Sequence, residues 1–221
     1  MYNEKIERNV NIKWKEGGFM NTKYWIINIT IITAILVFVQ IWKKYIFDKL
    51  SISLQNQKFD IYFETLDSLP CKWFFPLFNR LYMRLNGYMI LHNKQKINET
   101  ADALLNIRLS KKQAAETYLK CFYYYINEED KEYSEKVLKK INDIGEKDIS
   151  KQCNQLYDIF IKKESGHIES MEEQLNLCGD DYTKQMLHYL IGLQYGYQNN
   201  IKKQEEHFSF ASETMKNFIR S

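Results

Sequence analysis

Proline and glycine are scarce in this chain, with 2 Pro and 8 Gly in 221 residues. Disordered and collagen-like chains need many of both and few apolar residues, whereas 45% of this chain is hydrophobic and 15% aromatic. A strong charge of one sign is also missing, because 31 Lys and Arg stand against 28 Asp and Glu. The length predicts one or two folded domains.

The small positive charge is confined to the first part of the chain. Residues 1–44 contain seven basic and three acidic residues, and residues 45–221 contain 24 basic and 25 acidic residues. Nucleic-acid-binding domains have a clustered basic face. Residues 45–221 are nearly neutral, so nucleic acid is not expected to be the main ligand.

Cysteine and the usual catalytic motifs are also sparse. The four Cys have no CxxC or other metal-ligand spacing and are too few for a disulfide scaffold, so we expect reduced thiols in a helical core. No HExxH, GxxxxGK[ST], GxGxxG or GxSxG motif occurs. We therefore expect no metal, no cofactor and no enzymatic activity.

One segment differs from the rest of the chain, because residues 24–42 contain no charged residue. Nineteen helical residues extend about 28 Å, which is close to the thickness of the bilayer core. Tyr24, Trp25 and Trp42 stand at its ends, where interfacial aromatic residues are common, and Lys43 and Lys44 end it. The segment predicts a transmembrane helix, within a region spanning residues 20–44.

Two other interpretations of this segment are weaker. A signal peptide has a shorter apolar region and ends in small residues, which residues 39–42 do not provide. A buried core helix is disfavoured because every face of the segment is apolar, unlike any other segment of the chain.

The first nineteen residues need not be part of the protein. Residues with AT-rich codons (Lys, Ile, Asn, Tyr, Phe) dominate the composition, which indicates an AT-rich bacterial genome. In such a genome the sequence from Lys15 to Met20 back-translates to a ribosome-binding site followed by a start codon. We expect translation to begin at Met20, and the alternative is that residues 1–19 form a polar tail.

The start site decides the predicted orientation in the membrane. Counted from Met20, Lys23 precedes the apolar segment, and Lys43, Lys44 and Lys49 follow it. The positive-inside rule then places the large C-terminal part in the cytoplasm. If residues 1–19 are translated, their four basic residues reverse this count.

From residue 45 onward the apolar residues recur at helical spacing. The last apolar residues of four segments, at 69, 107, 144 and 177, are 38, 37 and 33 residues apart. Such a period with two helices per repeat is typical of an α-solenoid. We expect an all-α chain of about nine helices, with a helical repeat domain over residues 45–221.

The last predicted helix pair resembles a tetratricopeptide (TPR) repeat. The sequence from Ile191 to Tyr195 is similar to the L-G-x-x-Y of the first TPR helix, and Phe208 and Ala211 stand where the second helix has its F and A, while Gln204 departs from the expected Ala. The resemblance implies that Gly192 allows close approach of the paired helix and that Tyr195 and Phe208 fill the gap.

A TPR-like array implies a concave surface for a peptide or protein partner, lined by the first helix of each pair. Tyrosine suits such a surface because its ring offers apolar area and its hydroxyl a hydrogen bond. The candidates are Tyr82, Tyr123, Tyr157 and Tyr189. The prediction is a membrane-anchored scaffold or adaptor at the cytoplasmic face, and the alternative is an enzyme or ligand sensor whose site forms no sequence motif.

Overall fold

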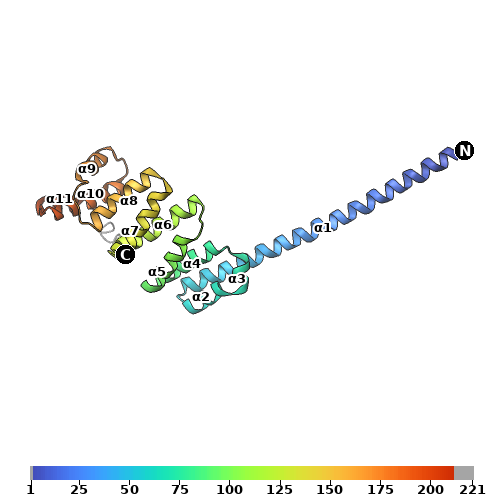
Figure 1. The fold of residues 1–221 in the computed structure, drawn as a ribbon, viewed down its shortest axis with the longest axis horizontal. Coiled ribbons are helices and arrows are strands. Elements are labelled where there is room, and N and C mark those ends of the chain that lie inside the picture. The colour runs from blue at the N-terminus through green and yellow to red at the C-terminus, as the bar shows by residue number, and fades with distance from the viewer. Residues whose placement is uncertain (1, 212–221) are drawn as a thin grey trace. The chain divides into compact units, whose positions relative to one another are not determined.

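The structure is a computed structural model that describes the backbone of residues 2–211 and the side chains of residues 24–211. This part of the chain is all-helical and contains no strand (Figure 1). The helices are α1 (Tyr2–Gln55), α2 (Phe59–Asp67), α3 (Leu69–Phe74), α4 (Leu77–Ile90), α5 (Lys94–Asn106), α6 (Lys111–Asn127), α7 (Lys131–Ile144), α8 (Lys147–Phe160), α9 (Ile168–Leu177), α10 (Asp181–Tyr197) and α11 (Ile201–Phe210).

The described residues form eleven helices where the periodicity predicted about nine. The two prolines account for much of the difference, because a proline has no amide hydrogen and suits only the first turn of a helix. Pro70 lies in the first turn of α3 and Pro76 is the N-cap of α4. The region around residues 58–90 is therefore split into three helices.

Helix α1 is the longest element and continues well past the predicted anchor (Figure 1). No Gly or Pro occurs from residue 19 to residue 69, so nothing in the sequence interrupts it. The portion Tyr24–Gln55 is long and apolar enough to cross a membrane, and its most apolar window is not buried by the rest of the chain. The boundary expected between residues 44 and 45 falls inside this helix.

The chain divides into two compact units, residues 1–97 and 98–221. In the first unit, α2 and α3 both pack against α1. Ile46 and Leu50 of α1 are buried in one cluster with Tyr62, Leu66 and Cys71. The C-terminal end of α1 is therefore a core helix of this unit.

Most helices of the second unit begin or end at residues with a clear local signal. Ser110 forms a capping box with Gln113, and the side chains of Asp130, Asp180 and Asn200 each accept an N-terminal amide hydrogen bond. Gly145 ends α7 with a φ of +78°, a conformation that favours glycine. Helix α8 begins after Glu146, without a side-chain cap, and has Asp148 in its first turn.

The second unit is built from neighbouring antiparallel helices. Helix α6 packs on α7, α7 on α8, α9 on α10, and α10 on α11. The cluster around α10 contains the buried side chains of Ile159, Met171, Leu187, Leu190 and Ile191. Side chains from α8, α9 and α10 therefore share one core cluster.

Glycines in α10 allow α11 to approach closely. A Cβ added to Gly192 would lie 2.6 Å from two ring atoms of Phe208, so only glycine leaves room for that ring. The ring also stacks on Tyr189, with centroids 5.6 Å apart. The close approach expected at Gly192 is therefore present in the structure.

Three of the four cysteines are buried, and all four are free thiols. Burial raises the pKa of Cys71, raises that of Cys121 to about 12 and raises that of Cys153 to about 11. A thiol is nucleophilic only when deprotonated. These three residues are therefore inert parts of the core.

Gly192→Ala should lower the free energy of unfolding. Alanine gains about 1 kcal/mol of helix propensity over glycine, but overpacking a core costs about 1–3 kcal/mol, and the Phe208 ring is held on both sides. The matched control is Gly196→Ala, where the added Cβ meets only the flexible side chain of Gln204. Urea unfolding should show Gly192→Ala as the less stable variant, and equal stability of the two would contradict the predicted clash.

Candidate functional site

The predicted partner surface consists of the first helix of each pair. In the second unit these helices are α6, α8 and α10, and α8 contacts both of the others. The Lys163 ammonium after α8 lies 3.3 Å from the Glu129 carboxylate after α6. The C-terminal ends of α6 and α8 are therefore neighbours, and the two helices can present side chains to a common face.

The four predicted tyrosines have different environments. Tyr157 and Tyr189 are buried, with 5% and 7% of their surface exposed, whereas 50% of Tyr123 is exposed. Tyr82 belongs to the other unit, is half-buried and lies against Phe78, with ring centroids 5.7 Å apart. Of the three predicted tyrosines in the second unit, Tyr123 alone offers a large accessible surface to a partner.

Tyr182 is a further exposed tyrosine, 46% exposed, in the first turn of α10. Burial raises the pKa of Tyr123, and the nearby Cys153 and Tyr182 raise it further. The three helices thus bring Tyr123, Cys153 and Tyr182 close together. Tyr182 is not among the tyrosines predicted from the sequence, since no spacing rule places it beside Tyr123.

A polar network closes the connection between α8 and α9. Asp158 accepts a 2.7 Å hydrogen bond from Lys162 and lies 3.0 Å from the His167 ring, and the backbone amide of His167 donates to Gln194. Burial opposes ionisation of Asp158, but the hydrogen bonds from Lys162 and His167 outweigh it and lower its pKa. The network fixes this connection against the fully buried Gln194 of α10.

A second polar cluster joins α9, α10 and α11. The Nδ1 atoms of His188 and His207 are 3.1 Å apart, so one ring must donate a hydrogen to the other. The Tyr195 hydroxyl donates to Glu172 and accepts from Lys203, at 2.9 and 3.0 Å. The His pair links the two helices that meet at Gly192.

Both histidines of this pair have a lowered pKa. For His188 the causes are burial and the charge of His207. For His207 the main cause is burial, with Lys203 acting in the same direction and Glu172 and Glu206 opposing it. Folding therefore favours the uncharged form of both imidazole rings.

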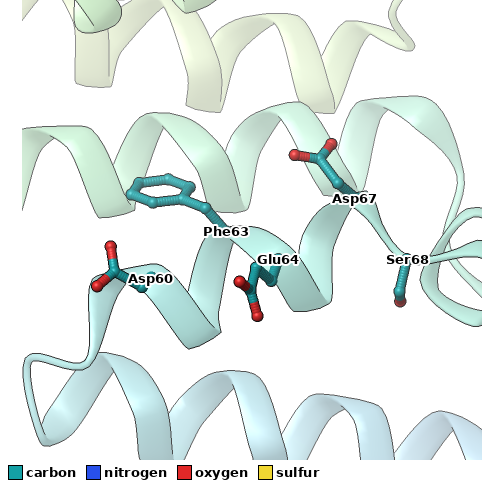
Figure 2. A pocket seen from close by; sticks show the side chains of 5 residues that line it. All are labelled: Asp60, Phe63, Glu64, Asp67 and Ser68. Carbon is teal, nitrogen blue, oxygen red and sulfur yellow. The ribbon is translucent and has the colours of Figure 1, made fainter.

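An open hollow lies on α2 and is lined by Asp60, Phe63, Glu64, Asp67 and Ser68 (Figure 2). Phe63 points toward the neighbouring helix, where its ring stacks on Tyr88 with centroids 4.4 Å apart. Asp67 is paired with Arg84 at 2.5 Å, and Glu64 points to another side of the helix. The carboxylates do not converge, and among the side chains of residues 24–211 no group of three or more His, Cys, Asp or Glu could hold a metal ion.

Comparisons of the chain with protein families, with curated proteins and with solved structures gave no significant match.

The His188–His207 pair should make stability depend on pH. A histidine whose folded pKa is below its unfolded value of about 6.5 contributes full stability above that pH and loses it as the pH falls. The melting temperature of the full chain in detergent should therefore drop between pH 7.5 and pH 5.5. His188→Gln with His207→Gln should reduce this drop.

His92→Gln is the matched control, because His92 lies in the turn after α4 and outside the pair. This variant should keep the pH dependence of the wild type. An identical drop in the double variant and the wild type would show that the pair does not cause it.

Proposed function

We propose that the chain is a membrane-anchored, TPR-like scaffold that binds a peptide or protein partner at the cytoplasmic face of the membrane. One observation carries the proposal. A single uninterrupted helix is apolar and exposed over residues 24–42, and its next turns, with Ile46 and Leu50, are buried in the core of the first unit. Such a helix joins a lipid-soluble segment to a folded body without a flexible linker.

The helix ends of the second unit support the repeat part of the proposal. Stacked repeats place their first helices parallel, so the C-terminal ends of these helices must gather on one side. Glu129 follows α6, pairs with Lys163 beyond the end of α8, and lies near enough to Tyr197 of α10 to raise its pKa, after the larger effect of burial. The ion pair brings the C-terminal ends of α6 and α8 together, as a stack of parallel first helices requires.

Gly192 and its partners support the resemblance at the level of one helix pair. The close contact with Phe208 and the burial of Tyr195 and Ala211 are those that the TPR motif implies for these positions. The face around Tyr123 and Tyr182 is the best candidate for a partner, because both rings are exposed and their hydroxyls can hydrogen-bond.

The anchor is tested by alkaline carbonate extraction of membranes from cells that express the full chain. The chain should stay in the membrane pellet. Ile31→Lys with Ile35→Lys should move it to the soluble fraction, since each central charge costs about 2.5–3.5 kcal/mol of insertion free energy. A reporter fused after Ser221 should be active on the cytoplasmic side, and activity on the other side would reverse the proposed orientation.

Partner binding is tested by affinity capture from a detergent extract of the native cells. Tyr123→Ser with Tyr182→Ser should lose a stoichiometric partner while keeping the melting temperature, because both rings are exposed. The matched control is Leu177→Ser, which removes an 88% exposed apolar side chain at the end of α9, a second helix of its pair. This control should keep the partner.

Two results would contradict the binding proposal. Capture that survives the double tyrosine substitution would place the partner elsewhere on the protein. A chain without a stoichiometric partner but with a ligand-dependent thermal shift would favour the enzyme or sensor. Tyr189→Ala does not distinguish these results, because it removes a buried ring stacked on Phe208.

A further inference from the structure

Helix α3 and the first turn of α4 leave large apolar side chains exposed beside the proposed anchor. Trp73 is 78% exposed, Leu69 64% and Leu77 51%, although Cys71 between them is fully buried. These three side chains, named here the α3 patch, are spaced four residues apart. Leu69 and Trp73 lie on α3, and Leu77 begins α4 just past the break at Pro76. Solvent exposure of this much apolar surface in one short stretch marks an interaction site.

The depth of α3 relative to the anchor follows from the packing of the first unit. Cys71 of α3 shares a core cluster with Ile46 of α1, and Ile46 lies four residues, or about 6 Å, beyond Trp42. The α3 patch is therefore next to the point where the apolar segment ends.

Helix lengths give the same depth independently. From Trp42 to Gln55, α1 rises about 20 Å, and α2 then returns about 13 Å along it before α3 begins. Figure 1 shows this hairpin, with α3 at the end of the unit from which the long part of α1 projects. The difference of about 7 Å again places α3 within the interfacial layer if residues 24–42 span the bilayer.

The charges around the patch match a lipid surface. Residues 68–83, which include the α3 patch, contain no Asp or Glu and two basic residues, Lys72 and Arg80. Lys72 lies within α3 itself and is exposed. Tryptophan with flanking Lys and Arg is typical of segments that lie in the headgroup region of anionic membranes.

We infer that the α3 patch inserts into the interfacial layer of the leaflet from which α1 emerges, as a second membrane contact that fixes the tilt of the first unit. This inference rests on the proposed anchor. Trp73 and Leu69 lie at the acyl boundary, and Lys72 faces the phosphates. The occupant of the patch is lipid and not a second protein.

Fluorescence of single-tryptophan variants in vesicles tests the inference on the full chain. Trp14, Trp25 and Trp42 are replaced by Phe to leave Trp73, and a sister variant keeps only Trp42. Both are reconstituted into phosphatidylcholine and phosphatidylglycerol vesicles whose acyl chains are brominated near the carbonyl end. Trp73 should be quenched to an extent comparable with Trp42 and should be shielded from aqueous acrylamide.

The matched control moves the indole to the far end of α4. Ile90 is 49% exposed and lies thirteen residues, or about 20 Å, beyond Leu77 along the helix. Ile90→Trp with all four native tryptophans replaced by Phe should be open to acrylamide and unquenched by the brominated lipid. Circular dichroism should show the same helix content for all variants.

The outcomes separate this inference from the anchor on which it rests. Quenching of both Trp42 and Trp73 supports the inference, and quenching of Trp42 alone overturns it while the anchor stands. Quenching of neither overturns both proposals. A Trp73 shielded from acrylamide without lipid quenching assigns the patch to a protein partner and also overturns the inference.

Discussion

The structure depends first on the continuity of α1 across the point where its environment changes. From Tyr24 to Trp42 nearly all of its side chains are exposed, and from one turn later Ile46 and Leu50 are buried against α2 and α3. Each residue of a helix adds the same rise and the same rotation about the axis. The end of the apolar segment therefore fixes the distance to Ile46 and Leu50 and the direction in which these side chains point. A flexible linker at this place would remove both constraints.

The second unit depends on a different constraint, which is the absence of side chains on one stripe of α10. Gly192 and Gly196 are four residues apart, and Phe208 and Gln204 of α11 occupy the space they leave. The approach of the two backbones brings His188 to His207 and Lys203 to Tyr195. Polar groups are therefore held between the helices, and their pKa values depend on the same packing that the glycines allow.

The sequence predicted local features well because their chemistry is local. Ser110, Asp130 and Asp180 act through amides three residues away, so each cap could be recognised from its neighbours alone. The environments of the candidate tyrosines could not be predicted, because helical spacing does not say which stripe a neighbouring helix covers. Tyr157 and Tyr189 are covered, and Tyr123 is not.

Contacts over long sequence distances were out of reach for the same reason. Asp158, His167 and Gln194 meet only after α8, α9 and α10 have packed, and no spacing rule links them. The extension of α1 past Lys43 had a visible signal, namely the lack of Gly and Pro up to residue 69. Two lysines mark the end of an apolar segment and do not mark the end of a helix.

The fold also changes the charge argument for orientation. Counted along the chain, Lys43, Lys44 and Lys49 follow the apolar segment, and residues 1–19 would outweigh them if translated. The hairpin of α1 and α2 brings α3 back toward the same end of the unit (Figure 1). Lys72 belongs to α3, and Arg80 lies near the start of α4, the next helix. With Lys72 and Arg80 included, five basic residues lie on the C-terminal side of the apolar segment. Lys23 and the four basic residues of 1–19 give five on its N-terminal side. Counted in this way the two sides are equal, so residues 1–19, if kept, no longer favour the opposite orientation for the proposed anchor.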